Sequence, residues 1–124
     1  MTKVLPILLL AGLFWACGGN SGSGDAGSKP AQDLSANPDY QKGMALIAKN
    51  DCLTCHKVDE KLIGPAYREV ANKYAGSDTA TTYLAHKIMK GGTGVWGQVA
   101  MAAHPNLTED DAVALAKYVL LLKN

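Results

Sequence analysis

The chain has 124 residues, of which 48% are hydrophobic and 19% are charged, and its formal net charge at pH 7 is +1. A chain of this length forms one small domain. The near balance of charge excludes a protein that binds nucleic acid or an anionic surface through overall electrostatic attraction. The chain has three cysteines, an odd number, so at least one of them remains outside any internal pairing.

The N-terminal residues have the pattern of an export signal. A short basic start over residues 1–3 precedes an apolar run over residues 4–16, which is too short to span a bilayer. Ala16-Cys17 follows, and a small residue directly before a cysteine resembles the cleavage site of a bacterial lipoprotein, whose cysteine is acylated. We therefore expect a signal peptide over residues 1–16 and a lipid anchor on Cys17. The alternative is an ordinary signal peptide with an unpaired cysteine beside it.

Residues 17–36 are rich in glycine and serine, and we expect them to be a flexible tether that carries the lipidated cysteine. The folded domain is expected over residues 37–124. Capping residues, glycine stops and apolar periodicity predict four helices. They run from Pro38 to about Lys49, from just after Pro65 to about Ala75, from about Ser77 or Asp78 to just before Gly91, and from just after Thr108 to the C-terminal residues.

Residues 91–107 form a long, glycine-rich loop between the last two predicted helices, and no strand pattern appears. Gly43, inside the first helix, is expected where another helix approaches closely. Met44 and Met89 fall within helical patterns and are expected in the core.

The most specific motif of the chain is Cys52-Leu53-Thr54-Cys55-His56, a C-x-x-C-H sequence. Two thiols at this spacing can each form a thioether with a haem vinyl group, and the histidine that follows can bind the iron. A redox-active C-x-x-C would need a surrounding βαβ pattern, which is missing here. A zinc site would need a second pair of ligands, whereas His86 and His104 are far apart in the sequence. The motif therefore predicts covalent haem attachment.

A haem bound by one histidine has a second axial position, and the residue that fills it decides between electron transfer and small-molecule binding. Met101 lies in the long loop, where its thioether can reach the other face of the ring. His104 follows closely and is an alternative ligand if the loop shifts. The segment around Met101 has no proline before Pro105, so we expect a mobile loop and an iron–sulfur bond that opens easily.

Four segments resemble the small bacterial class I c-type cytochromes of the cytochrome c551/c552 kind. They are Gly64-Pro65-Ala66-Tyr67, Gly94-Val95-Trp96-Gly97, Met101 and Leu115-Ala116-Lys117-Tyr118-Val119, in the order of the family. The resemblance implies an all-α class I cytochrome c fold, with four to five short helices around one covalently bound haem c.

The same resemblance implies roles for individual residues. Cys52 and Cys55 would attach the haem, and His56 and Met101 would be its axial ligands. Pro65 would support the histidine, Trp96 would donate a hydrogen bond to a haem propionate, and Lys87 would face a propionate.

Together these features predict a carrier of single electrons rather than an enzyme, with redox proteins of a respiratory chain as partners and no small-molecule substrate. It would act at the periplasmic face of a membrane, anchored through Cys17. Its basic side chains would form a rim for an acidic partner around the exposed haem edge, and these are Lys57, Lys61, Lys87 and Lys90. The alternatives are a gas-binding or gas-sensing haem module from which Met101 dissociates, a peroxidase and a thiol oxidoreductase.

Overall fold

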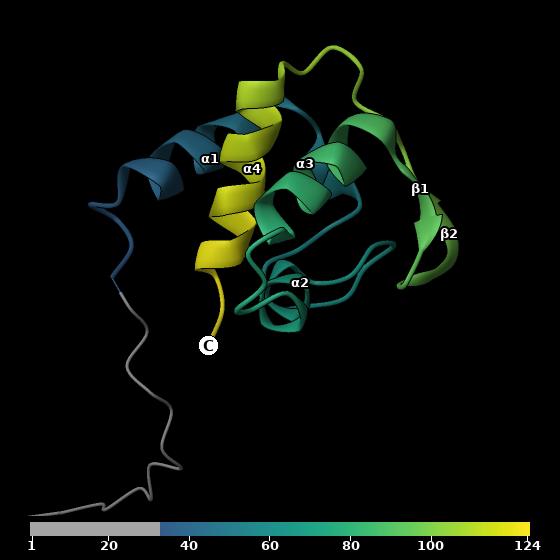
Figure 1. Ribbon diagram of the computed structural model, residues 1–124, viewed down its shortest axis with the longest axis horizontal. Coiled ribbons are helices and arrows are strands. Elements are labelled where there is room, and N and C mark those ends of the chain that lie inside the picture. Colours follow the sequence, from purple (N-terminus) through teal and green to yellow (C-terminus); the bar gives the residue numbers. More distant parts are fainter. Residues whose placement is uncertain (1–32) are drawn as a thin grey trace, which may run out of the picture.

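The structure is a computed structural model that describes residues 33–124. The predicted signal peptide, Cys17 and most of the predicted tether lie outside the described residues. The elements in chain order are α1 (Pro38–Lys49), the short 3₁₀ turn η1 (Cys52–Thr54), α2 (Tyr67–Lys73), α3 (Ala80–Lys90), β1 (Gly92–Gly94), β2 (Gly97–Met101) and α4 (Glu109–Leu121). Figure 1 shows the helices gathered around α4, with the two strands at one end of the molecule.

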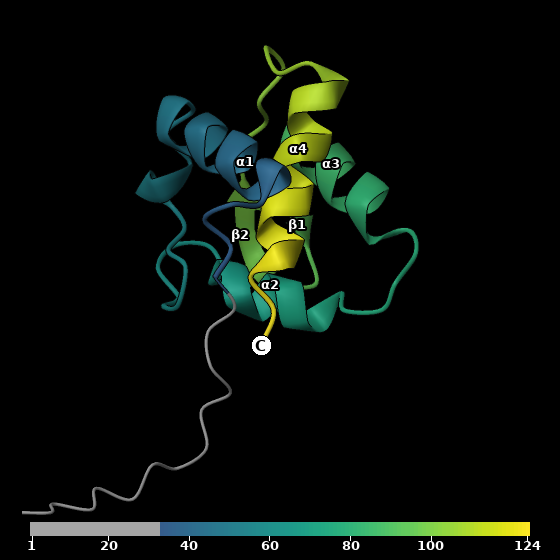
Figure 2. The ribbon, with the colours of Figure 1, turned by 90° about the vertical axis from the view of Figure 1, so that its left-hand side faces the viewer.

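Helices α1 and α4, from the two ends of the domain, cross each other (Figure 2). Helix α1 begins as predicted, because the side chain of Asn37 accepts hydrogen bonds from the backbone N–H groups of Asp39 and Tyr40 at 2.9 and 3.1 Å. Gly43 is buried at the crossing, and a Cβ atom there would overlap the side chain of Tyr118. The predicted close approach of a second helix at Gly43 is therefore confirmed.

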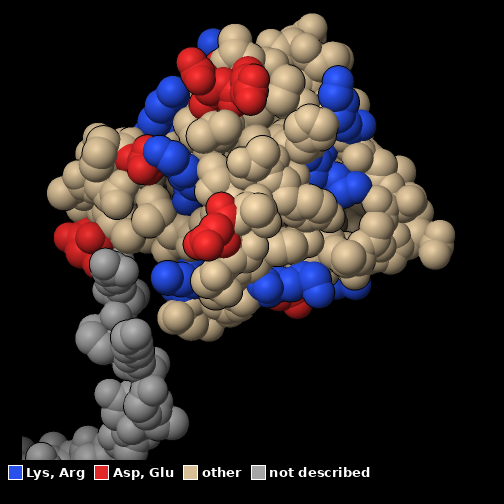
Figure 3. All heavy atoms as spheres, viewed as in Figure 1, with Lys and Arg blue, Asp and Glu red and all other residues tan. Residues whose placement is uncertain are grey.

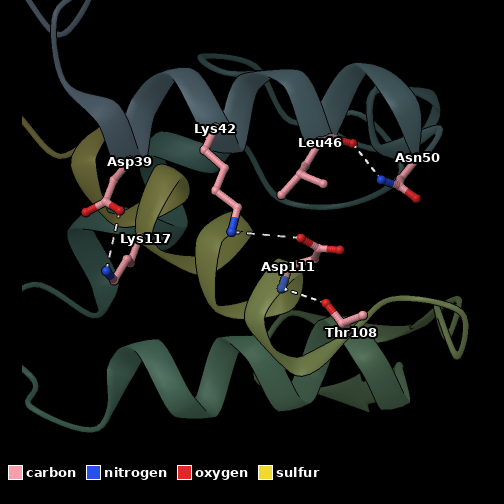
Figure 4. A network of polar contacts seen from close by, with 7 residues as sticks. All are labelled: Asp39, Lys42, Leu46, Asn50, Thr108, Asp111 and Lys117. Carbon is pink, nitrogen blue, oxygen red and sulfur yellow. Dashed lines mark hydrogen bonds and ion pairs between the residues drawn. The ribbon is translucent and has the colours of Figure 1, made fainter.

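Polar side chains join α1 to α4 at the surface of this crossing (Figure 4). Lys117 lies 3.4 Å from Asp39, and Lys42 lies 3.9 Å from Asp111. The hydroxyl of Thr108 accepts a hydrogen bond from the backbone N–H of Asp111 at 3.1 Å, which caps α4 as its sequence predicts. These exposed pairs contribute little energy, so the crossing is held mainly by its buried apolar side chains.

The core is built around α4. Its buried positions face α1, α2 and α3, and they are Ala112, Ala114, Leu115, Ala116, Tyr118 and Val119. Helix α1 contributes Ile47 to the core, whereas Met44 is 49% exposed. The prediction that Met44 is a core residue is wrong, because the inward face of α1 follows Gly43 and Ile47. Met89 packs against the core from a partly buried position.

The two strands correct the prediction that the chain has none. β1 and β2 pair in an antiparallel hairpin in which Gly92 is opposite Met101 and Gly94 is opposite Gly97. The sequence gives no signal for it, because glycine is depleted in strands and Gly92–Gly94 has no alternation of apolar and polar residues. Among residues 33–124, no helix is long and apolar enough to cross a membrane.

Candidate cofactor site

A cavity of about 850 Å³ opens beside the helical core. This volume is within the range of roughly 300–1,000 Å³ that is usual for ligand and cofactor pockets. Its lining is largely apolar, with Leu84, Ile88, Leu115 and Val119 contributed by α3 and α4. The described residues that the sequence predicts to bind a cofactor all line this one cavity, and they are Cys52, Cys55, His56, Pro65, Lys87, Trp96 and Met101.

The two cysteines lie on a tight turn directly after α1. Asn50 ends the helix, with its side-chain amide donating to the carbonyl of Leu46 at 2.8 Å. Asp51 then adopts a left-handed backbone conformation with φ of +53°, which reverses the chain into η1. The backbone N–H of His56 donates to the carbonyl of Cys52 at 3.1 Å. This turn brings both thiols and the imidazole to the wall of the same cavity.

The imidazole of His56 is held on three sides. Its Nδ1–H donates to the carbonyl of Pro65 at 2.8 Å, an arrangement that leaves the lone pair of Nε2 free to bind a metal. The ring of Tyr67 stacks on the imidazole, with 5.2 Å between ring centroids and 18° between planes. A Cβ atom on Gly64 would overlap the imidazole. The sequence had suggested neither the stacking of Tyr67 nor the contact of Gly64, although the adjacency of Gly64 to Pro65 marked the segment.

The environment of the thiols does not favour the redox or the zinc alternative. Burial raises the pKa of the Cys52 thiol, whereas a redox-active C-x-x-C needs a thiol whose pKa is lowered. Both cysteines are free in the structure. Within residues 33–124, no group of three or more histidine, cysteine or acidic side chains comes together as a metal site. Free thiols beside an apolar cavity and a histidine with an available Nε2 fit a covalently attached haem.

The hairpin and the segment after it provide another wall of the cavity. Met101 ends β2 and is partly buried, and Trp96 is 38% exposed. The ammonium group of Lys87 donates to the backbone carbonyls of Thr93 and Gly91 at 2.7 and 3.2 Å. Lys87 is therefore engaged with the backbone at the base of the hairpin, an interaction that the sequence did not suggest.

Two further residues stand near this wall. His104 lines the cavity, and both its backbone N–H and its Nδ1 lie within hydrogen-bonding distance of the carbonyl of Ile88, at 3.2 and 3.3 Å. The ammonium group of Lys73, at the end of α2, lies 5.4 Å from the centroid of the Trp96 ring. Sequence reasoning missed Lys73, because a lysine at the end of a helix carries no signal of a distant partner.

Comparison with known proteins agrees with this geometry. The cytochrome c family matches residues 40–123. Cytochrome c-552 of Nitrosomonas europaea is 50% identical over 78 residues, which cover 63% of this chain and 76% of the relative. Cytochrome c-551 of Stutzerimonas stutzeri is 47% identical over 83 residues, which cover 67% of this chain and 79% of the relative.

Solved structures show the same fold. The crystal structure of wild-type Nitrosomonas europaea cytochrome c552 matches with a TM-score of 0.62 and 49% identity, covering 64% of this chain and 99% of that one. The crystal structure of the class 1 cytochrome MtoD from Sideroxydans lithotrophicus ES-1 matches with a TM-score of 0.58 and 27% identity, covering 66% and 94%. The predicted class I cytochrome c fold is thus confirmed.

The fold and the cavity define a small haem protein of the c type, whose cofactor is attached through the thiols of a C-x-x-C-H turn. The chain belongs to the cytochrome c family. It carries one covalently attached haem c and is an electron carrier. Bacterial cytochromes of the c-551 and c-552 kind, to which this chain is similar, are exported, periplasmic proteins that act with redox protein partners.

Proposed function

We propose that the protein passes single electrons between respiratory-chain proteins through a haem whose axial ligands are His56 and Met101. The observation that supports this most directly is the hydrogen bond of 2.8 Å between His56 Nδ1 and the Pro65 carbonyl. It fixes the imidazole with Nε2 available, and Met101 lines the same cavity from the end of β2. One nitrogen ligand and one sulfur ligand are thereby available from two separate elements.

Haem iron held by a neutral imidazole and a thioether has a higher reduction potential than iron held by two imidazoles, and it rearranges little between oxidation states. The chain's own residues provide the conditions for this chemistry. Pro65 and Tyr67 fix the orientation of the His56 ring. The apolar side chains from α3 and α4 exclude water, and Cys52 and Cys55 prevent loss of the cofactor from so small a domain. In this proposal Trp96 donates to a propionate.

The charged surface supports an acidic redox partner. Lys61 lines the cavity, and Lys87 and Lys90 come from the end of α3. Figure 3 shows basic side chains on the side where α3 leads into the hairpin and acidic side chains where α4 begins. Lys57 is less available than the sequence suggested, because Glu60 lies 3.0 Å from its ammonium group. Opposite charge on a partner would speed association around the cavity mouth.

We further propose that a lipid on Cys17 tethers the domain to a membrane. The described chain begins at the end of the molecule away from the hairpin (Figure 1). The folded domain begins a few residues earlier than the sequence predicts, because Leu34 packs against the core and the Gln41 side chain donates to the carbonyl of Ser35. A flexible segment over residues 18–32 would reach about 21 Å, since the end-to-end distance grows as roughly 5.5 Å times the square root of the residue number. The haem edge would then remain accessible to partners while the domain stays close to the membrane.

The ferric absorption spectrum tests the axial ligands. The wild-type protein should show the sulfur-to-iron charge-transfer band, and Met101→Ala should abolish it. Met89→Leu is the matched control, because Met89 packs against the core and does not line the cavity. Persistence of the band in Met101→Ala would remove Met101 from the site.

Carbon monoxide separates the carrier from the gas-binding alternative. The reduced wild-type protein should bind it slowly or incompletely at neutral pH, because Met101 occupies the position that the gas would need. Fast and complete binding would favour the gas-binding alternative.

The intact mass of membrane-extracted protein tests the proposed lipid anchor. We expect a polypeptide that begins at Cys17 and carries acyl chains. A soluble, unmodified Cys17 would contradict the anchor alone.

A further inference from the structure

The β1–β2 hairpin carries Met101 but is only loosely joined to the helices. Its residues are exposed except for Met101, which is partly buried. The hairpin therefore has little apolar packing of its own to fix its position, and side-chain contacts to the helices matter more than they do in the core.

The base of the hairpin is tied to α3. The Lys87 ammonium group donates to the carbonyl of Gly91, just before β1, and to the carbonyl of Thr93, in the middle of β1. On the way out of β2, the backbone N–H of His104 donates to the carbonyl of Ile88 at 3.2 Å. These contacts join β1 and the chain after β2 to α3, and none of them involves Val95 or Trp96 in the turn between the strands.

The tip contacts a different helix. Trp96 lies in the turn between the strands, and the Lys73 ammonium group lies 5.4 Å from its ring centroid, within the limit of about 6 Å for a cation–π interaction. Lys73 is the last residue of α2, and the first residue of α2 is Tyr67, which stacks on His56. The contact therefore joins the helix that orients His56 to the hairpin that carries Met101.

We propose that Lys73 is a positioning residue for Met101. Its ammonium group holds the Trp96 ring against α2 and so keeps the tip of the hairpin closed over the cavity, with Met101 at the other end of the same short strand pair. This inference rests on the proposed function, because it requires Met101 to be an axial ligand. Loss of the contact would favour an open hairpin, in which Met101 would be drawn away from the cavity and so from an iron held by His56.

The size of the effect follows from the exposure of the contact. Exposed cation–π pairs are worth about 0.5–1 kcal/mol, which corresponds to roughly a two- to fivefold change in the ratio of open to closed forms. A ligand that binds only the open form gains apparent affinity by the same factor while that form is rare.

Binding of imidazole to the ferric holoprotein measures this ratio. Imidazole can bind the iron only where Met101 has left, and at mildly alkaline pH it is largely neutral, so loss of a lysine charge does not alter its attraction to the protein. Lys73→Gln should raise the apparent association constant two- to fivefold. Lys73→Arg should match the wild type, because arginine also stacks on tryptophan. Lys49→Gln is the matched control, since Lys49 is likewise an exposed lysine at the end of a helix, loses the same charge and does not line the cavity.

A double-mutant cycle separates positioning from a general loss of stability. In a Trp96→Leu background, Lys73→Gln should have no further effect on imidazole binding, because the partner ring is already absent. Equal imidazole affinity in Lys73→Gln and Lys49→Gln would overturn the inference, as would an effect of Lys73→Gln that persists without Trp96.

Failure of the inference can be distinguished from failure of the proposed function. If Met101 is not a ligand, the wild-type protein binds imidazole as tightly as Met101→Ala and lacks the sulfur charge-transfer band. If only the role of Lys73 is wrong, the wild type keeps that band and resists imidazole, and Lys73→Gln does the same.

Discussion

Gly64→Ala tests how closely the loop after the C-x-x-C-H turn fits the imidazole. A methyl group at this position would overlap the His56 ring, with Nδ1 at 2.7 Å and Nε2 at 2.9 Å from the new Cβ. The ring has little freedom to move away, because Tyr67 stacks on it and the Pro65 carbonyl bonds Nδ1. The substitution must therefore strain this hydrogen bond, displace the loop, or do both.

The expected magnitude combines two effects. Overpacking of a well-filled site costs about 1–3 kcal/mol of stability. Replacing glycine by alanine also restricts the unfolded chain, which offsets about 0.4–1 kcal/mol where the backbone conformation is permitted. We therefore expect Gly64→Ala to lower the free energy of unfolding by about 1–2 kcal/mol.

Gly94→Ala is the matched control for this experiment. Gly94 lies at another wall of the same cavity, and the nearest atom to a Cβ there is the Lys87 ammonium nitrogen at 3.7 Å, an ordinary contact distance. Denaturant unfolding of the holoproteins, followed through the haem absorption, measures both variants. Equal stability of Gly64→Ala and Gly94→Ala would refute the close fit of Gly64 against His56.

Three further predictions concern the core, the alkaline limit and the second axial position. Gly43→Ala should lower the free energy of unfolding, measured with denaturant, by about 1–3 kcal/mol, because the new Cβ would overlap the side chain of Tyr118 on α4. Met44→Ala, at the exposed neighbouring position, should change it by less than about 0.5 kcal/mol. Burial raises the pKa of Tyr67 above its ordinary value of about 10. The free energy of unfolding should therefore fall as the pH rises above about 10, because the unfolded chain loses the phenol proton first. Tyr67→Phe should make the free energy of unfolding less dependent on pH in this range, and an unchanged pH dependence would count against the burial effect. Met101→Ala should open the ferrous iron to carbon monoxide. The double variant Met101→Ala/His104→Ala should bind the gas with the same affinity, because His104 stays bonded to the Ile88 carbonyl of α3. Much tighter binding by the double variant would identify His104 as a replacement ligand.

The helices and the location of the site follow from local sequence signals. Asn37 and Thr108 cap the first and last helices, and both caps are present in the structure. The C-x-x-C-H motif and Met101 are far apart in the sequence, yet they line one cavity. The predicted caps are confirmed because capping bonds are short-range properties that the order of residues expresses directly.

What the sequence did not reveal depends on contacts between distant segments. The stacking of Tyr67 on His56 and the approach of Lys73 to Trp96 arise only when loops and helices pack together. Met44 was misplaced because its neighbour Gly43, a residue without a side chain, occupies the position on α1 that lies against α4, so Met44 faces outward.

The central claim is that a haem is bonded covalently to Cys52 and Cys55 in the cavity beside His56. Intact mass of the purified, matured protein after denaturation in acid and acetone tests it most directly. We predict the mass of the polypeptide plus one haem, with no titratable thiol at either cysteine. A colourless polypeptide of unmodified mass, with its pigment in the acetone phase, would contradict the account.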